Sequence, residues 1–208
     1  KLISNAGYAI SITHIFVAVS TIVPMLAINN FYTSAELGLY ALALSVIFLP
    51  NAILTISIGN VYFENLIKNK NNALQLITKT LAISFPLSCF IFLPFIFFGE
   101  EIFSVVFGES WKKSGEMAAI LSFAAMVGFI TGTIDRTCLV RKINSHGPVW
   151  SFFRMIITFA TSSYSVFYGV EIEFFILISS ISMIFLYIID FTLQIIYGIQ
   201  LQKNSINP

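Results

Sequence analysis

The chain has 208 residues, of which 57% are hydrophobic and only 10% are charged, and its formal net charge is +1. A soluble domain carries about 25% charged residues, so this composition excludes an ordinary soluble globule and indicates a membrane protein. A net charge so close to zero provides no basic surface for nucleic acid, and no nucleic-acid partner is expected.

Six apolar runs follow one another along the chain, each near the ~20 residues that a helix needs to cross the hydrocarbon core. They cover residues 8–28, 38–59, 80–98, 116–134, 148–169 and 174–197. The runs are continuous, whereas a strand of a membrane barrel has about 10 residues that alternate in polarity. The sequence therefore predicts an all-α integral membrane protein, with six transmembrane helices in one domain over residues 1–208.

The chain starts at Lys1 rather than at a methionine and enters its first apolar run by Tyr8, and this run is too long and lacks the cleavage pattern of a signal peptide. We therefore expect the chain to be a fragment of a longer one or the product of a truncated gene. The second connection, VYFENLIKNKNNALQLITKT, mixes apolar residues with lysines and asparagines. This pattern predicts an amphipathic helix or a pair of turns on the membrane surface, and a solvated loop is the alternative.

Small residues and prolines mark several spans. Ala124, Gly128 and Gly132 form a small-xxx-small stripe in the fourth span, which predicts close helix packing. Four prolines lie in or beside apolar runs and predict bent helices: Pro24, Pro50, Pro86 and Pro94.

The lysines and arginines of the connections predict the orientation, because cytoplasmic loops of membrane proteins are enriched in them. With both termini inside, the outer connections hold only Lys112 and Lys113. The inner segments then hold Lys1, Lys68, Lys70, Lys79, Arg136, Arg141, Lys142 and Lys203. Both termini are therefore predicted to be cytoplasmic.

Ionisable residues within spans are costly and indicate function. Counted from the cytoplasmic ends of their spans, His14, Arg154 and Asp190 each lie roughly 9–10 Å deep at 1.5 Å per residue. These three candidate substrate-binding residues would line a cavity open to the cytoplasm. Alternatively, Arg154 snorkels or forms a structural pair with Asp190.

The outer connection VVFGESWKKSGEM contains the candidate membrane-interface residues. Trp111 is predicted to lie at headgroup level, and Lys112 and Lys113 to reach lipid phosphates. Gly108 and Gly115 are interpreted as turn residues.

Enzyme signatures are not found in the sequence: it has no phosphate-binding glycine loop, no His/Cys ligand cluster and no nucleophile elbow. His14 and His146 are far apart, and Cys89 and Cys138 fit no metal spacing. We expect no enzymatic activity, no catalytic residue, no metal and no cofactor.

Three segments resemble the C-terminal half of oligosaccharide/polysaccharide (O-antigen type) flippases, which belong to the multidrug/oligosaccharidyl-lipid/polysaccharide exporter superfamily. They are ELGLYALALSVIFLP (36–50), ISIGNVYFENL (56–66) and VFGESWKKSGEMAAILSF (106–123). The resemblance implies one six-helix lobe of a two-lobe transporter in the bacterial cytoplasmic membrane. Its substrate would be a lipid-linked sugar, and its partners would be membrane lipids and a missing N-terminal lobe or a second copy.

Other functions stay open at this point. They are a drug or cation exporter of the same superfamily, a membrane glycosyl or acyl transferase, and a non-functional remnant or structural membrane subunit.

Overall fold

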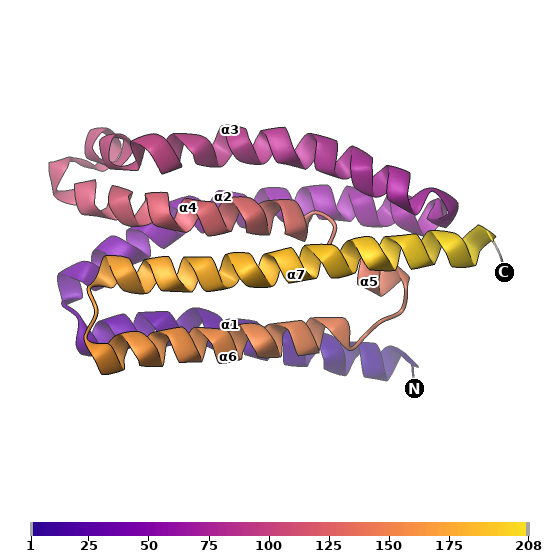
Figure 1. Cartoon of the computed structure of the whole chain (residues 1–208), viewed down its shortest axis with the longest axis horizontal. Coiled ribbons are helices and arrows are strands. Elements are labelled where there is room, and N and C mark those ends of the chain that lie inside the picture. Colours follow the sequence, from indigo (N-terminus) through magenta and orange to yellow (C-terminus); the bar gives the residue numbers. More distant parts are fainter. Residues whose placement is uncertain (1, 207–208) are drawn as a thin grey trace.

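The computed structural model describes residues 2–206, with the side chains of Tyr8 and residues 11–205. Six long helices run up and down one elongated bundle (Figure 1). They are α1 (Leu2–Phe31), α2 (Ser34–Lys68), α3 (Ala73–Phe107), α4 (Lys112–Gly132), α6 (His146–Tyr168) and α7 (Ile172–Ile206), and the short helix α5 (Thr137–Val140) precedes α6. The described residues form no strand. The all-α prediction is confirmed, and each long helix contains or nearly contains one predicted span.

Five of these helical segments are long and apolar enough to cross a membrane, namely those of α1, α2, α3, α4 and α7. Helix α6 has 23 residues, which is sufficient by length. However, its buried face consists of small hydroxyl residues rather than large apolar ones, and it is not among the five. A sixth crossing by α6 therefore stays a prediction.

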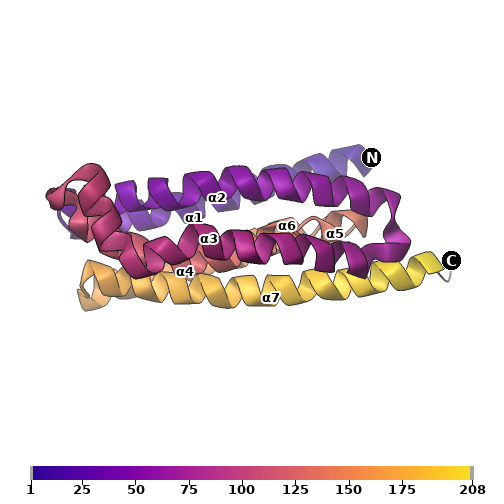
Figure 2. The same cartoon turned by 90° about the horizontal axis from the view of Figure 1, so that it is seen from above.

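The helices form two groups (Figures 1 and 2). Helix α1 packs mainly against α6, while α4 packs against α2, α3 and α7. The two groups touch chiefly where α6 contacts α7 and where α1 contacts α2. The start of α1, the end of α7 and the connections 69–72 and 133–145 lie at one end of the bundle, which we call the inner end. The outer end holds the connections 32–33, 108–111 and 169–171.

The second connection differs from its prediction. Helix α2 continues to Lys68, and only the 3₁₀ turn Lys70–Asn72 separates it from α3. With 35 residues, α2 is about 52 Å long at 1.5 Å per residue. That exceeds the ~30 Å hydrocarbon core. The expected surface helix or loop is wrong, because Tyr62, Leu66 and Ile77 pack into an apolar core at the inner end instead of facing lipid.

Two predicted turn glycines have different roles. Gly108 has a φ of 100° and ends α3. Gly115 instead lies inside α4, where its backbone meets that of Gly99 on α3. A Cβ atom built on Gly99 would lie 2.5 Å from the Gly115 carbonyl oxygen. The prediction of a turn at Gly115 is wrong, because this glycine permits close helix packing.

The four prolines at which bends were predicted all lie inside helices. Helix α3 contains two of them, Pro86 and Pro94, and is kinked at Phe98, whose φ of −131° is not helical. The kink confirms a bend in α3. It turns the last residues of the helix towards the start of α4 at the outer end (Figure 1).

Candidate functional site

The main pocket lies in the inner half of the bundle, between the α1–α6 pair and helices α4 and α7, and has a volume of about 550 Å³. Helix α1 contributes Thr13, His14 and Val17 to its wall. The remaining wall comes from the end of α4 with the following turn, the start of α6, and the pocket-facing side of α7. The pocket thus occupies the separation between the two helix groups.

Glycines bring the walls of this pocket together. Gly128 on α4 faces the ring of Tyr187 on α7, and a Cβ atom there would lie 2.9 Å from that ring. Gly132 faces Thr55 of α2, with only 2.6 Å for a Cβ atom. The predicted packing role of the small-residue stripe is therefore confirmed, and two of its members also line the pocket.

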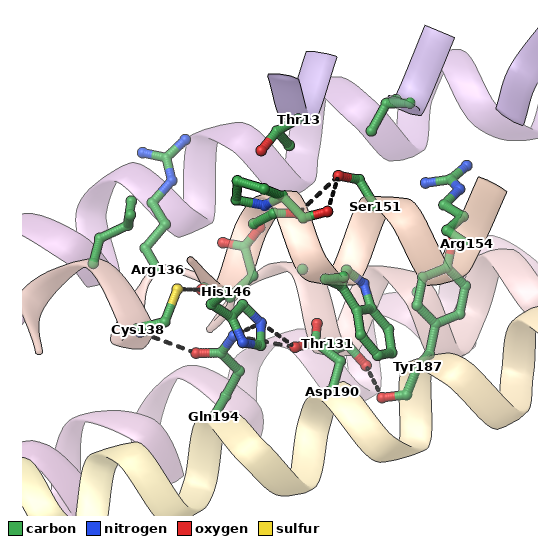
Figure 3. A pocket seen from close by; sticks show the side chains of 18 of the residues that line it. Thr13, Thr131, Arg136, Cys138, His146, Ser151, Arg154, Tyr187, Asp190 and Gln194 are labelled. Carbon is green, nitrogen blue, oxygen red and sulfur yellow. Dashed lines mark hydrogen bonds and ion pairs between the residues drawn. The ribbon is translucent and has the colours of Figure 1, made fainter. Parts of the chain in front are cut away.

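A histidine–aspartate pair joins α6 to α7 at the pocket wall (Figure 3). His146 Nε2 lies 2.9 Å from Asp190 Oδ1, and the two side chains are 10% and 7% exposed. Gln194 Nε2 donates to the same Asp190 oxygen at 3.2 Å. The orientation of this amide is defined by its other end, because the backbone N–H of Cys138 donates to Gln194 Oε1 at 3.1 Å.

These contacts indicate which nitrogen of His146 carries a proton. Because Asp190 Oδ1 can only accept from the ring, Nε2–H donates to it. The other nitrogen, Nδ1, lies 3.4 Å from the hydroxyl of Tyr197. The ring also stacks on Trp150, with centroids 6.3 Å apart. Neutral His146 accepts from Tyr197, and protonated His146 donates to it.

Arg154 lies on α6, away from the histidine pair (Figure 3). Its Nε is buried and has no hydrogen-bond partner among the described residues. The alternative of an Arg154–Asp190 pair is wrong, since the ion pair of Asp190 is with His146. The sequence places Asp190 at its predicted depth by counting from a span end at residue 197, whereas α7 continues to Ile206. The pair with His146 shows that Asp190 is level with the first residue of α6.

Arg136 occupies the opposite side of the pocket from Arg154 (Figure 3). It follows α4, and its guanidinium donates to the side-chain oxygen of Asn60. The same guanidinium lies 5.9 Å from the centre of the Phe63 ring. Both partners belong to α2, so this arginine is held in place before any ligand arrives.

The three residues predicted from depth meet in this pocket: His14, Arg154 and Asp190 all line it. Their binding of a substrate stays a prediction. Sequence reasoning missed His146 and Asp135, which also line it. Both were assigned to a connection, although His146 begins α6 and lies close to the predicted span. A predicted span that began two residues earlier would have included His146 among the ionisable residues within spans, as it included His14, Arg154 and Asp190.

The predicted interface residues lie at the outer end. Trp111 ends a 3₁₀ turn and is half-buried. Lys112 pairs with Glu100 at 3.5 Å, and Lys113 with Glu173 at 2.8 Å. A second cavity of about 580 Å³ lies beside them, between the α1–α2 and α6–α7 turns. The lysines therefore have carboxylate partners within the chain, and their contact with lipid phosphates stays a prediction.

Comparison with known proteins now adds to this geometry. A family model described as "Polysaccharide biosynthesis protein" matches residues 3–116, which is more than half of the chain. The chain belongs to this family. No curated protein and no solved structure matches it. The matched residues comprise α1 to α3 and the start of α4, so of the pocket wall they include only the residues on α1.

Family membership and the five apolar helices together indicate a multi-pass membrane protein with a role in polysaccharide biosynthesis. This result agrees with the resemblance of the sequence to membrane proteins of polysaccharide export, at the level of a membrane protein in polysaccharide biosynthesis. The pocket itself, built mainly from α4, α6 and α7, lies outside the matched residues and has to be interpreted from its own chemistry.

Proposed function

We propose that the chain forms one six-helix lobe of a flippase that moves polyprenyl-diphosphate-linked oligosaccharide across the bacterial cytoplasmic membrane for the synthesis of surface polysaccharide. Membership of the polysaccharide biosynthesis family supports the pathway. The long apolar helices support a membrane carrier, and the charged side chains that line the pocket within the bundle, such as Arg136, Arg154 and Asp190, support a path for a hydrophilic headgroup.

The observation that carries the proposal is the guanidinium of Arg154 in the pocket, whose buried Nε has no hydrogen-bond partner among the described residues. A buried donor without a partner is destabilising, so a ligand in the pocket that accepted from this nitrogen would be bound favourably. A guanidinium donates two parallel hydrogen bonds to a phosphate and stays charged at every physiological pH. A lipid diphosphate is the matching ligand.

The rest of the pocket suits a phosphorylated sugar. Its volume of about 550 Å³ falls within the range of small-ligand sites. Arg136 supplies a second fixed positive charge, while Ser151 and Trp150 supply a hydroxyl group and an aromatic surface. These are groups that can contact phosphate oxygens, sugar hydroxyls and the apolar face of a sugar ring.

We also propose that a second six-helix unit covers the pocket, either another lobe or a second copy of this chain. His14 and Asp135 line the pocket and have exposed side chains. Facing lipid, such ionisable groups would be costly. A second unit placed against this side would enclose them in a central, water-accessible cavity.

This partner requirement predicts the outcome of complementation. The 208-residue chain, expressed as a monomer in a flippase-deficient strain, is expected not to restore surface polysaccharide. Restoration should require co-expression of an N-terminal lobe, or a tandem fusion of two copies. Single-molecule photobleaching of a fluorescent fusion counts the copies. Restored polysaccharide with only single bleaching steps would contradict the need for a partner.

The orientation predicts a labelling pattern, starting from a variant that lacks both native cysteines. Single cysteines at Asn30, Ser110 and Glu171 lie at the outer end and are exposed. They should react with an impermeant maleimide added to intact cells. Lys68→Cys is exposed at the inner end and should react only after permeabilisation. The reverse pattern would place both termini outside.

A further inference from the structure

The side-chain hydrogen bonds between the inner end of α6 and α7 converge on one side chain. Among the described residues, His146 takes part in every side-chain hydrogen bond between these helices at the inner end. Its hydrogen-bond partners on α7 are Asp190 and Tyr197, and the amide nitrogen of Gln194 lies 3.1 Å from the same ring nitrogen that donates to Asp190. Among the described residues, the other side-chain hydrogen bond between α6 and α7 is longer and nearer the outer end, between Ser179 and Thr161 at 3.5 Å.

At the outer end α6 and α7 are connected covalently by a short turn. Gly169, with a φ of 59°, ends α6 and leads into α7 after a short turn. The hydroxyl of Tyr32 donates to the carbonyl of Val170 at 2.8 Å, which ties α1 to this turn. The outer end is therefore suited to act as a hinge for the α1–α6 pair.

Between hinge and histidine, α6 buries small hydroxyl side chains instead of large apolar ones: Ser151, Thr158, Thr161, Ser162 and Ser165. The hydroxyls of Ser162 on α6 and Ser180 on α7 are buried with no partner among the described residues. Unpaired hydroxyls gain hydrogen bonds when water reaches them, and small side chains bury little apolar area. The packing of α6 is thus weakly held and easily hydrated.

Histidine is the side chain whose ordinary chemistry allows it to gain or lose a proton near neutral pH. The nearest charged group is Asp190, and Asp135 is close enough to interact electrostatically with both. The other titratable groups around the pair are Tyr197 on α7, Cys138 on α5, Arg136 and Arg141 beside α5, Arg154 on α6 and His14 on α1. Protonated His146 attracts both carboxylates, while neutral His146 leaves them to repel each other.

We propose that the His146–Asp190 pair is a proton-operated latch that holds the inner end of the α1–α6 pair against α7 and so controls entry to the pocket. Proton binding to His146 closes the latch. Loss of the proton leaves a neutral hydrogen bond beside two carboxylates, and the α1–α6 pair then swings outward about the Gly169 turn. The role of this latch in transport rests on the proposed function. The motion of the α1–α6 pair can be measured without substrate.

The test is a pair of distances in the purified protein, in lipid nanodiscs and without a native cysteine. Spin labels at Val149 and Ile196 report on the inner ends of α6 and α7, and labels at Phe167 and Phe174 on their outer ends; all four positions are exposed. The pH is raised from about 5.5 to about 8.5, across the range in which an imidazole loses its proton. We expect the population with a long inner distance to rise about tenfold relative to the population with a short one, which corresponds to one pKa unit of coupling between proton binding and closure. The outer distance should not change.

Matched substitutions assign the effect to one histidine. His146→Gln retains an N–H donor for Asp190 but does not titrate, so its inner distance should not respond to pH. His14→Gln makes the same change at the other pocket histidine and should respond like the parent. Asp190→Asn should give long inner distances at both pH values.

Either of two results would overturn the latch. One is an inner distance in the parent that is independent of pH or shortens as the pH rises, and the other is an unaltered response in His146→Gln. If that variant does not fold, the parent and Asp190→Asn still decide between a latch and a fixed structural pair. A working latch without transport would reject the proposed function alone.

Discussion

Replacing Arg154 with alanine is expected to abolish transport of the lipid-linked sugar while leaving the amount of folded protein unchanged. The buried Nε of Arg154 has no partner within the chain, so removing the side chain breaks no internal hydrogen bond of that atom. A hydrogen bond to a charged group contributes about 1.5–3 kcal/mol, and a guanidinium makes two to a phosphate. Their loss corresponds to a reduction in affinity of about 100-fold or more, at 1.36 kcal/mol per tenfold change.

The lysine variant tests whether the fork or only the charge matters. Arg154→Lys retains a positive charge but donates to phosphate as a point charge, so binding should fall by about 10- to 150-fold, the loss of one such hydrogen bond. Binding of a polyprenyl diphosphate to nanodisc-embedded protein provides the measurement, with transport in the two-lobe context beside it. The monophosphate should bind the parent more weakly and be less sensitive to the lysine variant.

Arg141 provides the matched control for the lysine substitution. It also carries a buried guanidinium nitrogen without a partner, but it is not among the residues that line the pocket. Arg141→Lys should therefore leave diphosphate binding unchanged. Normal binding and transport by Arg154→Ala at normal expression would remove this arginine from the proposed site. An equal loss in Arg141→Lys would point to a general effect of the substitution on the fold rather than to a contact between Arg154 and the diphosphate.

The helices were predictable because their signal is local. Each span is a continuous apolar run, and crossing the hydrocarbon core requires about 20 such residues whatever they pack against. The ends of the helices were not predictable in this way. Residues 60–79 have the composition of a surface segment, yet Tyr62 and Leu66 are buried against α3 and α7. Only the tertiary arrangement shows that three helices extend beyond the expected membrane boundary and form a second core.

The site was partly predictable for a related reason. The cost of an ionisable group in a span is a property of the residue and its depth, and this rule brought His14, Arg154 and Asp190 to one pocket. The pairing between them depends on helix rotation and register, which the sequence does not state. The partner of Asp190 is 44 positions away along the chain, at the first residue of a helix. No local pattern connects the two.

Replacing Gly115 with alanine is expected to cause the largest loss of stability of the substitutions considered. A Cβ atom at this position would overlap the backbone of Gly99 and Glu100 on α3. Backbone atoms cannot rotate away as a flexible side chain can, so α3 and α4 would have to separate. Overpacking of this kind costs about 1–3 kcal/mol and sometimes more. At about 2–4 °C per kcal/mol for a chain of this size, a loss of ~3 kcal/mol lowers the unfolding temperature by roughly 6–12 °C.

Gly38→Ala is the control, since it makes the same substitution inside α2 at a position where no atom lies within 4 Å of the new methyl group. There alanine should be neutral or stabilising by up to about 1 kcal/mol, because it is the better helix former. Thermal unfolding of both variants in the same detergent compares a buried contact with an open site. Because the Gly99–Gly115 contact is at the outer end and the main pocket in the inner half, any Gly115→Ala protein that folds should bind a polyprenyl diphosphate as the parent does. Equal unfolding temperatures for the two variants would mean that α3 and α4 do not approach as closely as their glycines indicate.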